Sequence, residues 1–331
     1  MQLTFLGTSS GTPTKSRNVS AIAIKSENSK AWSLVDCGEG TQHRILNTNL
    51  SLNHLETICI THVHGDHCFG LPGLLASASL MGRTEPLTLI GPAGIDQYIK
   101  TAQLISETIL NYEINFIEVS EFSGQYKTRD FSICAATLSH RVPSYAYVFE
   151  EANLEKNLNI VKLKTDGVVA GPVWGQLQKN QDVELEDGRF LRASDYLLTP
   201  RKARKIIIAG DNDKPGLLEP YADGLDVLVH EATFTQDVYA RVGQHTGHST
   251  ASSVAKFAQK ISLSNLILTH FSARYSNFGE SPVITDISDE ASKEYNGVLF
   301  LAEDLEVFIL NKDGVLNKET AVHSDANAGR E

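Results

Sequence analysis

The stretch His62-Val63-His64-Gly65-Asp66-His67 places three imidazoles and one carboxylate within six residues. It follows the apolar run 58–60, which is typical of a buried β-strand, and it precedes a helical pattern. Residues i and i+2 of an extended segment point to the same side, so His62 and His64 can bind one metal ion together. Asp66 and His67, where the chain turns into the helix, can then face a second ion. Because such a cluster rarely serves only a structural purpose, the stretch predicts a metal centre.

Short β-branched runs elsewhere in the chain also lead into polar residues of the kinds that bind metal ions. Continuous apolar runs of this length suit strands that are buried on both faces of a sheet. Polar residues at the ends of such strands suit a site at one rim of the sheet. The runs are 206–208 before Asp211, 227–229 before His230, and 266–268 before His270.

Helical patterns separate these runs, over Leu71 to Leu80, Ile95 to Leu110 and Thr250 to Lys260. Ser249-Thr250 can cap the start of the last helix, because a hydroxyl accepts a hydrogen bond from the first turn. The alternation of buried strands with helices predicts the α/β class, with helices outside stacked sheets. A chain of 331 residues fits one large layered domain with an insertion.

The composition is that of an ordinary globular protein. Apolar residues make up 41% and charged residues 21%, far from the low hydrophobicity of disordered chains. The first residues lack the basic and long apolar regions of a signal peptide, and no stretch is long enough to span a membrane. The four cysteines show no C-x-x-C spacing, which suggests neither a disulfide framework nor a thiolate zinc site. We therefore expect a cytoplasmic protein with no membrane segment.

Charge is distributed unevenly along the chain. The net charge of −11 argues against broad, nonspecific nucleic-acid binding, which depends on many Lys and Arg contacts to phosphates. Residues 156–205 contain ten basic and six acidic residues, a net charge of +4 that leaves −15 for the rest. The segment 153–198 breaks the rhythm of strands and helices, so we interpret it as an inserted arm. The segment 311–331 is polar, and we expect a disordered tail there.

Three residues beyond the opening stretch need their context to be interpreted as ligands. Taken singly, His140 and His270 would be ordinary surface or hydrogen-bonded histidines, because most imidazoles bind no metal. A lone Asp211 after a strand would be a turn residue or a helix cap. Only their combination with the opening cluster supports a ligand role. Four other histidines lack that support and are interpreted as structural or solvated: His43, His54, His245 and His323.

Together, these residues resemble the metal-binding motifs of the metallo-β-lactamase superfamily. The resemblance implies a four-layer αββα sandwich over residues 1–310, with two Zn²⁺ per subunit and one bridging hydroxide. Zinc makes hydroxide available at neutral pH, and ions about 3.5 to 4 Å apart stabilise both the attacking and the leaving oxygens of a phosphodiester. The implied ligands are His62, His64 and His140 for one zinc, Asp66, His67 and His270 for the other, and Asp211 as the bridge.

Further motifs resemble those of the tRNase Z family in its short form. His230-Glu231-Ala232-Thr233 is similar to its HEAT motif, and His248-Ser249-Thr250 to its HST motif. Pro13-Thr14-Lys15-Ser16-Arg17-Asn18 matches its P-x-K-x-R-N loop. Gly171-Pro172, inside the arm, resembles the glycine-proline segment of its exosite, which grips the body of tRNA. The family implied is an endoribonuclease that removes 3′ trailers from precursor tRNA.

The resemblance also implies catalytic roles. Glu231 would orient and charge-stabilise His248, which would donate a proton to the departing 3′ oxygen. Asp66 would be both a metal ligand and the proton acceptor. In isolation, Glu231 could equally be a solvated surface carboxylate.

Substrate binding is implied for the basic loop and for the arm. Lys15, Arg17 and Asn18 would handle the RNA around the cleavage site, since Lys and Arg suit phosphate contacts and Arg also stacks on bases. Alone, that loop would be an exposed basic turn. Gly171 and Pro172 would shape an arm that binds tRNA.

We therefore expect a zinc-dependent endoribonuclease whose partners are precursor tRNA and a second copy of the chain, because in this family the arm of one subunit serves the other's active site. Its products would be a tRNA with a 3′ hydroxyl and a trailer with a 5′ phosphate. One alternative is a phosphodiesterase of the same fold that acts on small or cyclic nucleotides, which would not need the arm. Another is a noncatalytic RNA-binding relative, which would be expected to have lost ligands.

Overall fold

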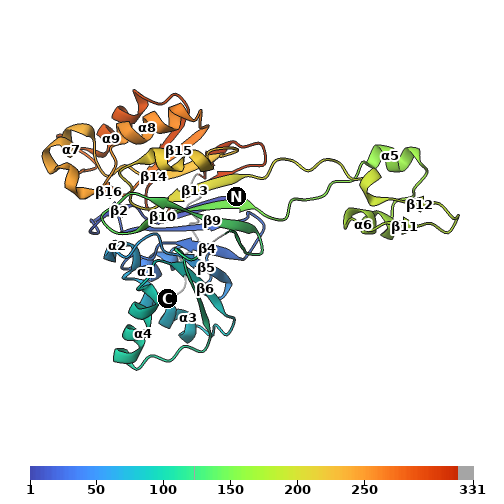
Figure 1. Cartoon of the computed structure of the whole chain (residues 1–331), viewed down its shortest axis with the longest axis horizontal. Coiled ribbons are helices and arrows are strands. Elements are labelled where there is room, and N and C mark those ends of the chain that lie inside the picture. Colours follow the sequence, from blue (N-terminus) through green and yellow to red (C-terminus); the bar gives the residue numbers. More distant parts are fainter. Residues whose placement is uncertain (123, 320–331) are drawn as a thin grey trace, which may run out of the picture. The chain divides into compact units, whose positions relative to one another are not determined.

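Two β-sheets lie face to face in the unit that Met1–Glu150 form with the residues from Arg204 onward (Figure 1). The computed structural model describes residues 1–122 and 124–319. The first sheet has the order β19-β18-β1-β3-β4-β5-β6-β7, in which β4 to β7 run parallel. Its strands are Gln2–Gly7 (β1), Ala21–Lys25 (β3), Trp32–Val35 (β4), Leu55–Cys59 (β5), Leu87–Gly91 (β6), Ile114–Glu118 (β7), Val307–Leu310 (β18) and Leu316–Lys318 (β19).

The second sheet has the order β17-β15-β14-β13-β10-β9-β8, in which β13, β14, β15 and β17 run parallel. Its parallel strands pair Ile207 with Leu228 and Leu228 with Leu266. Strands β14 and β15 are buried at every position, and therefore need the unbroken apolar runs seen in the sequence. The strands are Tyr126–Lys127 (β8), Phe131–Leu138 (β9), Ser144–Glu151 (β10), Lys205–Ala209 (β13), Val227–Glu231 (β14), Asn265–Thr269 (β15) and Val298–Leu301 (β17).

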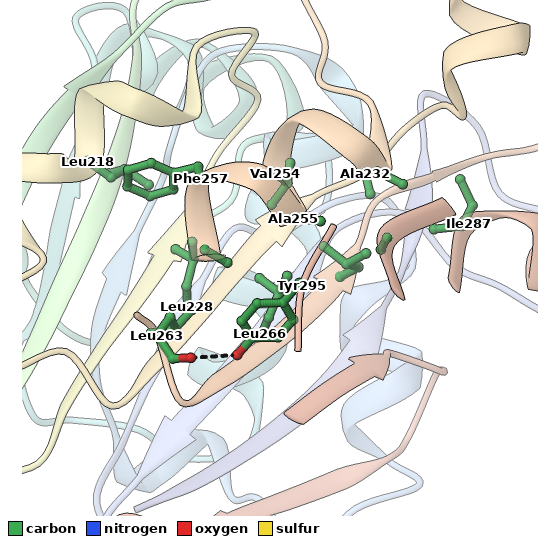
Figure 2. Close-up of a cluster of buried hydrophobic side chains, with 14 of the residues drawn as sticks. Leu218, Leu228, Ala232, Val254, Ala255, Phe257, Leu263, Leu266, Ile287 and Tyr295 are labelled. Atoms are coloured by element: carbon green, nitrogen blue, oxygen red, sulfur yellow. Dashed lines mark hydrogen bonds between the residues drawn. The ribbon is translucent and has the colours of Figure 1, made fainter. Parts of the chain in front are cut away.

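Helices cover the outer face of each sheet and complete four layers. Phe5, Tyr147 and Phe308 belong to the core between the sheets. A second core joins the first sheet to the helices Thr41–Ile45 (α1), Leu71–Leu80 (α3) and Ile95–Ser106 (α4). A third core joins the second sheet to the helices Ala251–Lys260 (α8) and Ile284–Ser292 (α9), and Phe257 of α8 lies in it with Leu228 (Figure 2). The predicted αββα arrangement is confirmed.

The predicted helices are present with small changes of length. Thr250 caps α8, since its hydroxyl accepts a hydrogen bond from the Ser253 N–H while Ser253 Oγ accepts one from the Thr250 N–H. Helix α4 ends before Leu110, because Glu107 adopts a left-handed backbone with φ of 53°. The helices of this unit are Thr41–Ile45 (α1), Gly65–Cys68 (α2), Leu71–Leu80 (α3), Ile95–Ser106 (α4), Gln236–Val242 (α7), Ala251–Lys260 (α8) and Ile284–Ser292 (α9).

Shorter elements complete the unit. Strand β2 (Ser9–Ser10) pairs in parallel with β16 (Phe271–Ser272), which follows β15 directly. Three 3₁₀ turns connect other elements: Leu52–His54, Pro215–Tyr221 and Gln244–Thr246. No helix in the described part of the chain has both the length and the apolar run needed to cross a membrane.

The C-terminal boundary differs from the prediction. We expected a disordered tail from 311, but Leu316–Lys318 form β19, which pairs with β18 and buries Leu316. The expectation of a tail beginning at 311 is therefore wrong for this stretch, because three residues are too few to show a strand period in a sequence. The rest of the expected tail, 320–331, lies outside the described residues.

Glu151–Ala203 form a second compact unit, slightly longer than the arm that we expected over 153–198. It contains the helices Ile160–Thr165 (α5) and Pro172–Gln178 (α6), the strand pair Val183–Glu184 (β11) and Phe190–Leu191 (β12), and a 3₁₀ turn at Ala193–Asp195. Its own small core includes Leu163, Leu177 and Tyr196. The Tyr196 hydroxyl donates a hydrogen bond to Asp166 at 2.8 Å and links two segments of the unit.

Candidate metal centre and active site

All of the predicted metal ligands follow the carboxyl ends of strands at one rim of the two sheets. His62 and His64 follow β5, His140 follows β9, Asp211 follows β13, and His270 follows β15. Helix α2 begins after His64 and carries the other two ligands. The structure thus brings all seven together in two groups whose donor atoms lie within 4.8 Å of one another: His62, His64, His140 and Asp211, and Asp66, His67 and His270.

The first group surrounds one point. His64 Nδ1 lies 3.1 Å from His62 Nε2 and 3.2 Å from His140 Nε2. Asp211 Oδ2 lies 3.5 Å from His62 Nε2 and 3.6 Å from His140 Nε2. Three imidazole nitrogens and one carboxylate oxygen therefore face each other.

The second group uses the other oxygen of the same aspartate. Asp211 Oδ1 lies 3.4 Å from His67 Nε2 and 3.3 Å from His270 Nε2. Asp66 Oδ2 lies 3.4 Å and 3.3 Å from the same two nitrogens. Asp211 thus presents one oxygen to each group, which is the arrangement of a bridging ligand.

The donor set fits zinc. A tetrahedron with ligand bonds of about 2.0–2.1 Å has edges of about 3.3–3.4 Å, close to the donor spacings in both groups. Asp211 Oδ1 is buried and has no hydrogen-bond partner among the described residues. A buried carboxylate oxygen left in this way is costly unless it binds a cation. Imidazole and carboxylate ligands in this number suit zinc or a similar transition metal.

Neighbouring groups fix the tautomers of the ligand imidazoles. The Nδ1–H of His67 donates to Asp36 Oδ2 at 2.7 Å, and that of His140 donates to the Gly247 carbonyl at 2.7 Å. His62 Nδ1 lies 3.0 Å from the hydroxyl of Thr61. These contacts leave Nε2 of each ring for a metal ion, and such outer partners both orient a ligand and increase its basicity.

Burial and charge set the protonation of the cluster. Burial alone would raise the pKa of Asp211, but the surrounding imidazoles, His270 first, bring it below its usual range. Burial lowers the pKa of His62. Burial acts in the same direction on His67, but the carboxylates of Asp66, Asp211 and Asp36 raise its pKa above the usual range. A metal ion that binds His67 must therefore displace a proton.

Glu231 and His248 form a buried pair beside this cluster. His248 Nδ1 lies 3.1 Å from Glu231 Oε1, and 3.7 Å from Asp211 Oδ2. Burial alone would lower the pKa of His248, but the Glu231 carboxylate raises it to about 9. Because Glu231 is completely buried, the alternative of a solvated surface carboxylate is wrong. The pair presents a protonated imidazole next to the metal ligands.

Three residues that support the site were missed by sequence reasoning. The Asn212 N–H donates to Glu231 Oε1 at 2.8 Å, and the Thr233 hydroxyl donates to Glu231 Oε2. Thr233 Oγ1 also lies 3.0 Å from His270 Nδ1, and since its own proton is directed to Glu231, it can accept a hydrogen bond from the N–H of that ring. Asp36 follows β4 as the ligands follow their strands, and this repeated position is the signal that could have identified it.

The basic loop between β2 and β3 reaches the metal ligands. The Gly11 N–H donates to Asp66 Oδ2 at 2.7 Å, and Gly11 adopts φ of 72°, a conformation that favours glycine. Lys15 is exposed. Asn18 instead holds the base of the loop. Its side-chain amide donates to the Glu39 carbonyl at 2.9 Å, and its backbone carbonyl accepts from the N–H groups of Thr8 and Ser9.

Arg17 differs from the prediction. We expected its guanidinium to contact RNA, but the side chain is only 8% exposed and lies inside the loop. Its guanidinium donates hydrogen bonds to Thr8 Oγ1 at 2.8 Å and to the Ala302 carbonyl at 2.7 Å. The guanidinium carbon, Cζ, lies 5.0 Å from the Phe271 ring centroid. Arg17 is therefore a structural residue of the loop. The charge pattern could not show this, because the acceptor at Ala302 is remote in sequence.

The remaining residues named in the sequence analysis are not among the seven ligands. Gly171 and Pro172 are exposed at the start of α6, in the second unit. Three of the histidines that we left unassigned are exposed, namely His43, His54 and His245. His323 lies outside the described residues.

Known proteins resemble the chain over most of its length. The profile of a family described as Anti-Pycsar protein Apyc1 matches residues 1–157. The ribonuclease Z of Marinobacter nauticus is 51% identical over 319 residues, which cover 96% of this chain and 99% of that protein. The crystal structure of the short form of human tRNase Z shares 26% identity at a TM-score of 0.62, covering 94% of this chain and 100% of that one. The fold is shared with the metallo-β-lactamase fold protein YhfI of Bacillus subtilis. The identity is 19% and the TM-score 0.63, over 92% of this chain and 98% of that one.

Proposed function

This chain belongs to the ribonuclease Z family, and from that premise we propose that it is the endoribonuclease that removes 3′ trailers from precursor tRNA. The observation that carries the proposal is the assembly, in a chain so similar to ribonuclease Z, of seven donor residues beside the buried Glu231–His248 pair. An RNA-binding relative without activity would not need that machinery.

Two zinc ions per chain are the proposed cofactors. His62, His64 and His140 would hold one, Asp66, His67 and His270 the other, and Asp211 would bridge them. When bound, zinc supplies hydroxide at neutral pH and positive charge for the phosphate oxygens. Elemental analysis of the purified protein should find two zincs per chain, and Asp211→Ala should lower the occupancy of both sites. Substitution of the exposed Asp237 should change neither. A fully active preparation with one metal per chain would contradict the proposal.

His248 is proposed to protonate the leaving group. Its Nδ1 is engaged by Glu231, which leaves Nε2 for the substrate. As the bond between phosphorus and the 3′ oxygen breaks, this oxygen takes the proton from His248 and becomes the 3′ hydroxyl of the tRNA. The phosphate stays on the trailer as its 5′ phosphate. Asp66, positioned by the Gly11 N–H, would accept the proton of the attacking water.

Substrate binding is proposed for two regions. Lys15 extends from the basic loop and can contact phosphate near the cleavage site, while Asn18 and the buried Arg17 hold that loop in shape. The arm, with Gly171 and Pro172 exposed on it, would grip the body of the tRNA. Residues 156–205 carry a net charge of +4, which supports a phosphate-binding role in an otherwise acidic chain.

The decisive experiment is incubation of the zinc-loaded protein with a 3′-extended precursor tRNA, with the cut mapped to the nucleotide. We expect one major cut at the junction of tRNA and trailer, a 3′ hydroxyl on the tRNA and a 5′ phosphate on the trailer. A cyclic nucleotide should be tested in parallel. Efficient hydrolysis of the cyclic nucleotide without cleavage of the precursor would reject the proposal in favour of a small-molecule phosphodiesterase.

A homodimer in the cytoplasm is the proposed state of the protein. A dimer would let the arm of one subunit serve the active site of the other, which suits an arm that forms its own compact unit. Sedimentation equilibrium should give twice the chain mass of 36.2 kDa. Cell fractionation should find the protein with cytoplasmic markers. A monomer with full activity, or enrichment in a membrane fraction, would contradict these proposals.

A further inference from the structure

Phe69 lies against Gly65, between the proposed ligands His64 and Asp66, and yet is widely exposed. It follows the last residue of α2, the helix that carries Asp66 and His67, and 60% of its surface is open to solvent. Its ring packs on the backbone of Gly65, where an added Cβ would lie 2.3 Å from Phe69 Cε2. Gly65 stands between His64 and Asp66 in the sequence. One side of the ring therefore contacts the peptide segment that joins two of the proposed ligands.

The ring is held in place from other directions too. The Phe69 N–H donates to the Gly65 carbonyl at 2.9 Å, which fixes the backbone that carries the ring. The ring of Tyr98, from α4, lies 6.2 Å from it between centroids at an angle of 41°, within the range of interacting aromatic pairs. The contacts with Gly65 and Tyr98 restrict the Phe69 ring, so it would lose less conformational entropy on binding a partner than an unpacked side chain would.

A single exposed phenylalanine is common on protein surfaces and by itself means little. This one differs because it is fixed within a few residues of the cluster that must receive a phosphodiester. RNA that reaches the cluster places the bases beside the cleaved bond in the same neighbourhood. Stacking of a base on an aromatic ring needs no positive charge. That property matters in a chain of net charge −11, in which 40 acidic residues outnumber 29 Lys and Arg residues.

We propose that Phe69 is a stacking platform for an unpaired base next to the cleaved bond of precursor tRNA. The inference rests on the proposed function, since it requires a single-stranded RNA substrate. Every base has a π face, so this contact tolerates any sequence at the junction of tRNA and trailer. Phe69 binds substrate and leaves the chemical step to the residues already described.

The test compares four zinc-loaded proteins on the same precursor tRNA: wild type, Phe69→Ala, Phe69→Leu and Phe69→Trp. Loss of one stacked base should raise KM by about 5- to 150-fold in the Ala and Leu variants, with kcat nearly unchanged. Leu keeps the apolar volume but has no π face, whereas Trp should restore a KM near that of wild type. Leu104→Ala is the matched control, because Leu104 is 79% exposed on α4 and should leave KM unchanged.

A series of precursors with one abasic nucleotide each, from the last tRNA position to the third trailer position, locates the contact. At one of these positions the abasic change should raise the KM of wild type but not that of Phe69→Ala, because both changes remove the same interaction. Equal KM for wild type and Phe69→Ala, full activity of Phe69→Leu, or additive effects at every position would overturn the proposal. If wild type fails to cut any precursor, the proposed function fails instead.

Discussion

Glu231 and Asp211 are both buried carboxylates, but their oxygens are satisfied in different ways. Glu231 accepts from the Asn212 N–H, from the Thr233 hydroxyl and from His248. Asp211 Oδ1 has no hydrogen-bond partner in the described part of the chain. Both oxygens of Glu231 thus accept hydrogen bonds, and its charge stabilises the imidazolium of His248. Asp211 Oδ1 instead requires a metal ion. Removing Glu231 should impair catalysis, whereas removing Asp211 should impair metal binding.

His248→Ala should slow the cleavage of precursor tRNA by about 100- to 10,000-fold, because general acid catalysis typically contributes that much. Both zincs should remain bound. Glu231→Gln should show a related loss, since a neutral amide stabilises the imidazolium less than a carboxylate does. The double variant should lose less than the product of the two factors, as expected for residues that act as a unit.

A substrate with a better leaving group checks this assignment. A phenolate needs little help from an acid, so His248→Ala should damage hydrolysis of a nitrophenyl phosphodiester much less than cleavage of tRNA. Equal damage on both substrates, or loss of zinc, would remove the proton-donor role from His248.

Lys15 and Arg17 belong to the same loop but should respond differently to substitution. Arg17→Ala leaves the buried acceptors Thr8 Oγ1 and Ala302 O without a donor, so it should lower the free energy of unfolding by about 1–3 kcal/mol. Lys15→Ala should leave stability unchanged but alter the position of the cut or the response to a CCA end. Denaturant unfolding and cleavage mapping separate the two effects. An unchanged cleavage map for Lys15→Ala would make that residue an ordinary surface lysine.

Spacing could predict the ligands of the opening cluster because their geometry is local. It could not predict that Asp36 fixes the His67 ring, since the two residues are 31 positions apart and meet only through folding. Nor could it show the burial of Arg17, whose charge suggested a surface role. The role of Asn212 likewise depends on a contact with Glu231, 19 positions away. Thr233 lies close to Glu231 in the sequence, but its contact with His270 spans 37 positions.

Strand β19 and the arm show where element boundaries were hard to predict. Long apolar runs such as β14 carry a clear signal, and their positions were predicted from it. Leu316–Lys318 is too short to carry one, and becomes a strand only because β18 offers its edge. The arm was recognised as an interruption of the strand pattern, but its small core around Leu163 and Tyr196 could not be predicted from mixed polar sequence.

Replacing the arm, 153–198, by a short flexible linker should abolish cleavage of precursor tRNA. Hydrolysis of a small nitrophenyl phosphodiester should persist, because binding remote from the reacting bond matters only when the substrate reaches it. The arm forms its own compact unit, so its removal leaves the sheets and the ligand loops complete. Equal loss of both activities in a folded, zinc-loaded variant would show that the arm is not a tRNA-binding element.

At the scale of the whole molecule, the alternation of apolar strands with helices was sufficient to predict helices outside stacked sheets, because each sheet must cover both of its faces. The four-layer αββα order itself was implied by the resemblance to the metallo-β-lactamase superfamily. The excess of acidic residues has a separate consequence for RNA binding. Residues outside 156–205 carry a net charge of −15, so we expect the contacts to phosphate to be concentrated in the arm and the basic loop. The affinity for tRNA should therefore depend weakly on salt for a nucleic-acid enzyme.

Raising the salt concentration from 50 to 200 mM should weaken tRNA binding by less than about 100-fold, whereas a protein with six to ten phosphate contacts loses about 1,000- to 100,000-fold. Binding of a precursor to an inactive His248→Ala protein, measured over this range, gives the slope directly. The arm-deleted protein should show a still smaller slope. If the affinity of the arm-deleted protein still depends steeply on salt, the main phosphate contacts belong to the unit that contains the two sheets.

The hydrogen bond from the Gly11 N–H to Asp66 Oδ2 joins the basic loop, for which we propose a role in RNA binding, to a proposed metal ligand. If RNA binds the loop and zinc binds Asp66, this hydrogen bond can couple the binding of the two. Such a coupling changes both affinities by the same factor. If RNA holds the loop in this conformation, it must also tighten the retention of zinc by the same factor by which zinc tightens RNA binding. Working enzyme would then give up its metal to a chelator more slowly than idle enzyme, so that substrate supply itself would protect the catalyst when zinc is scarce.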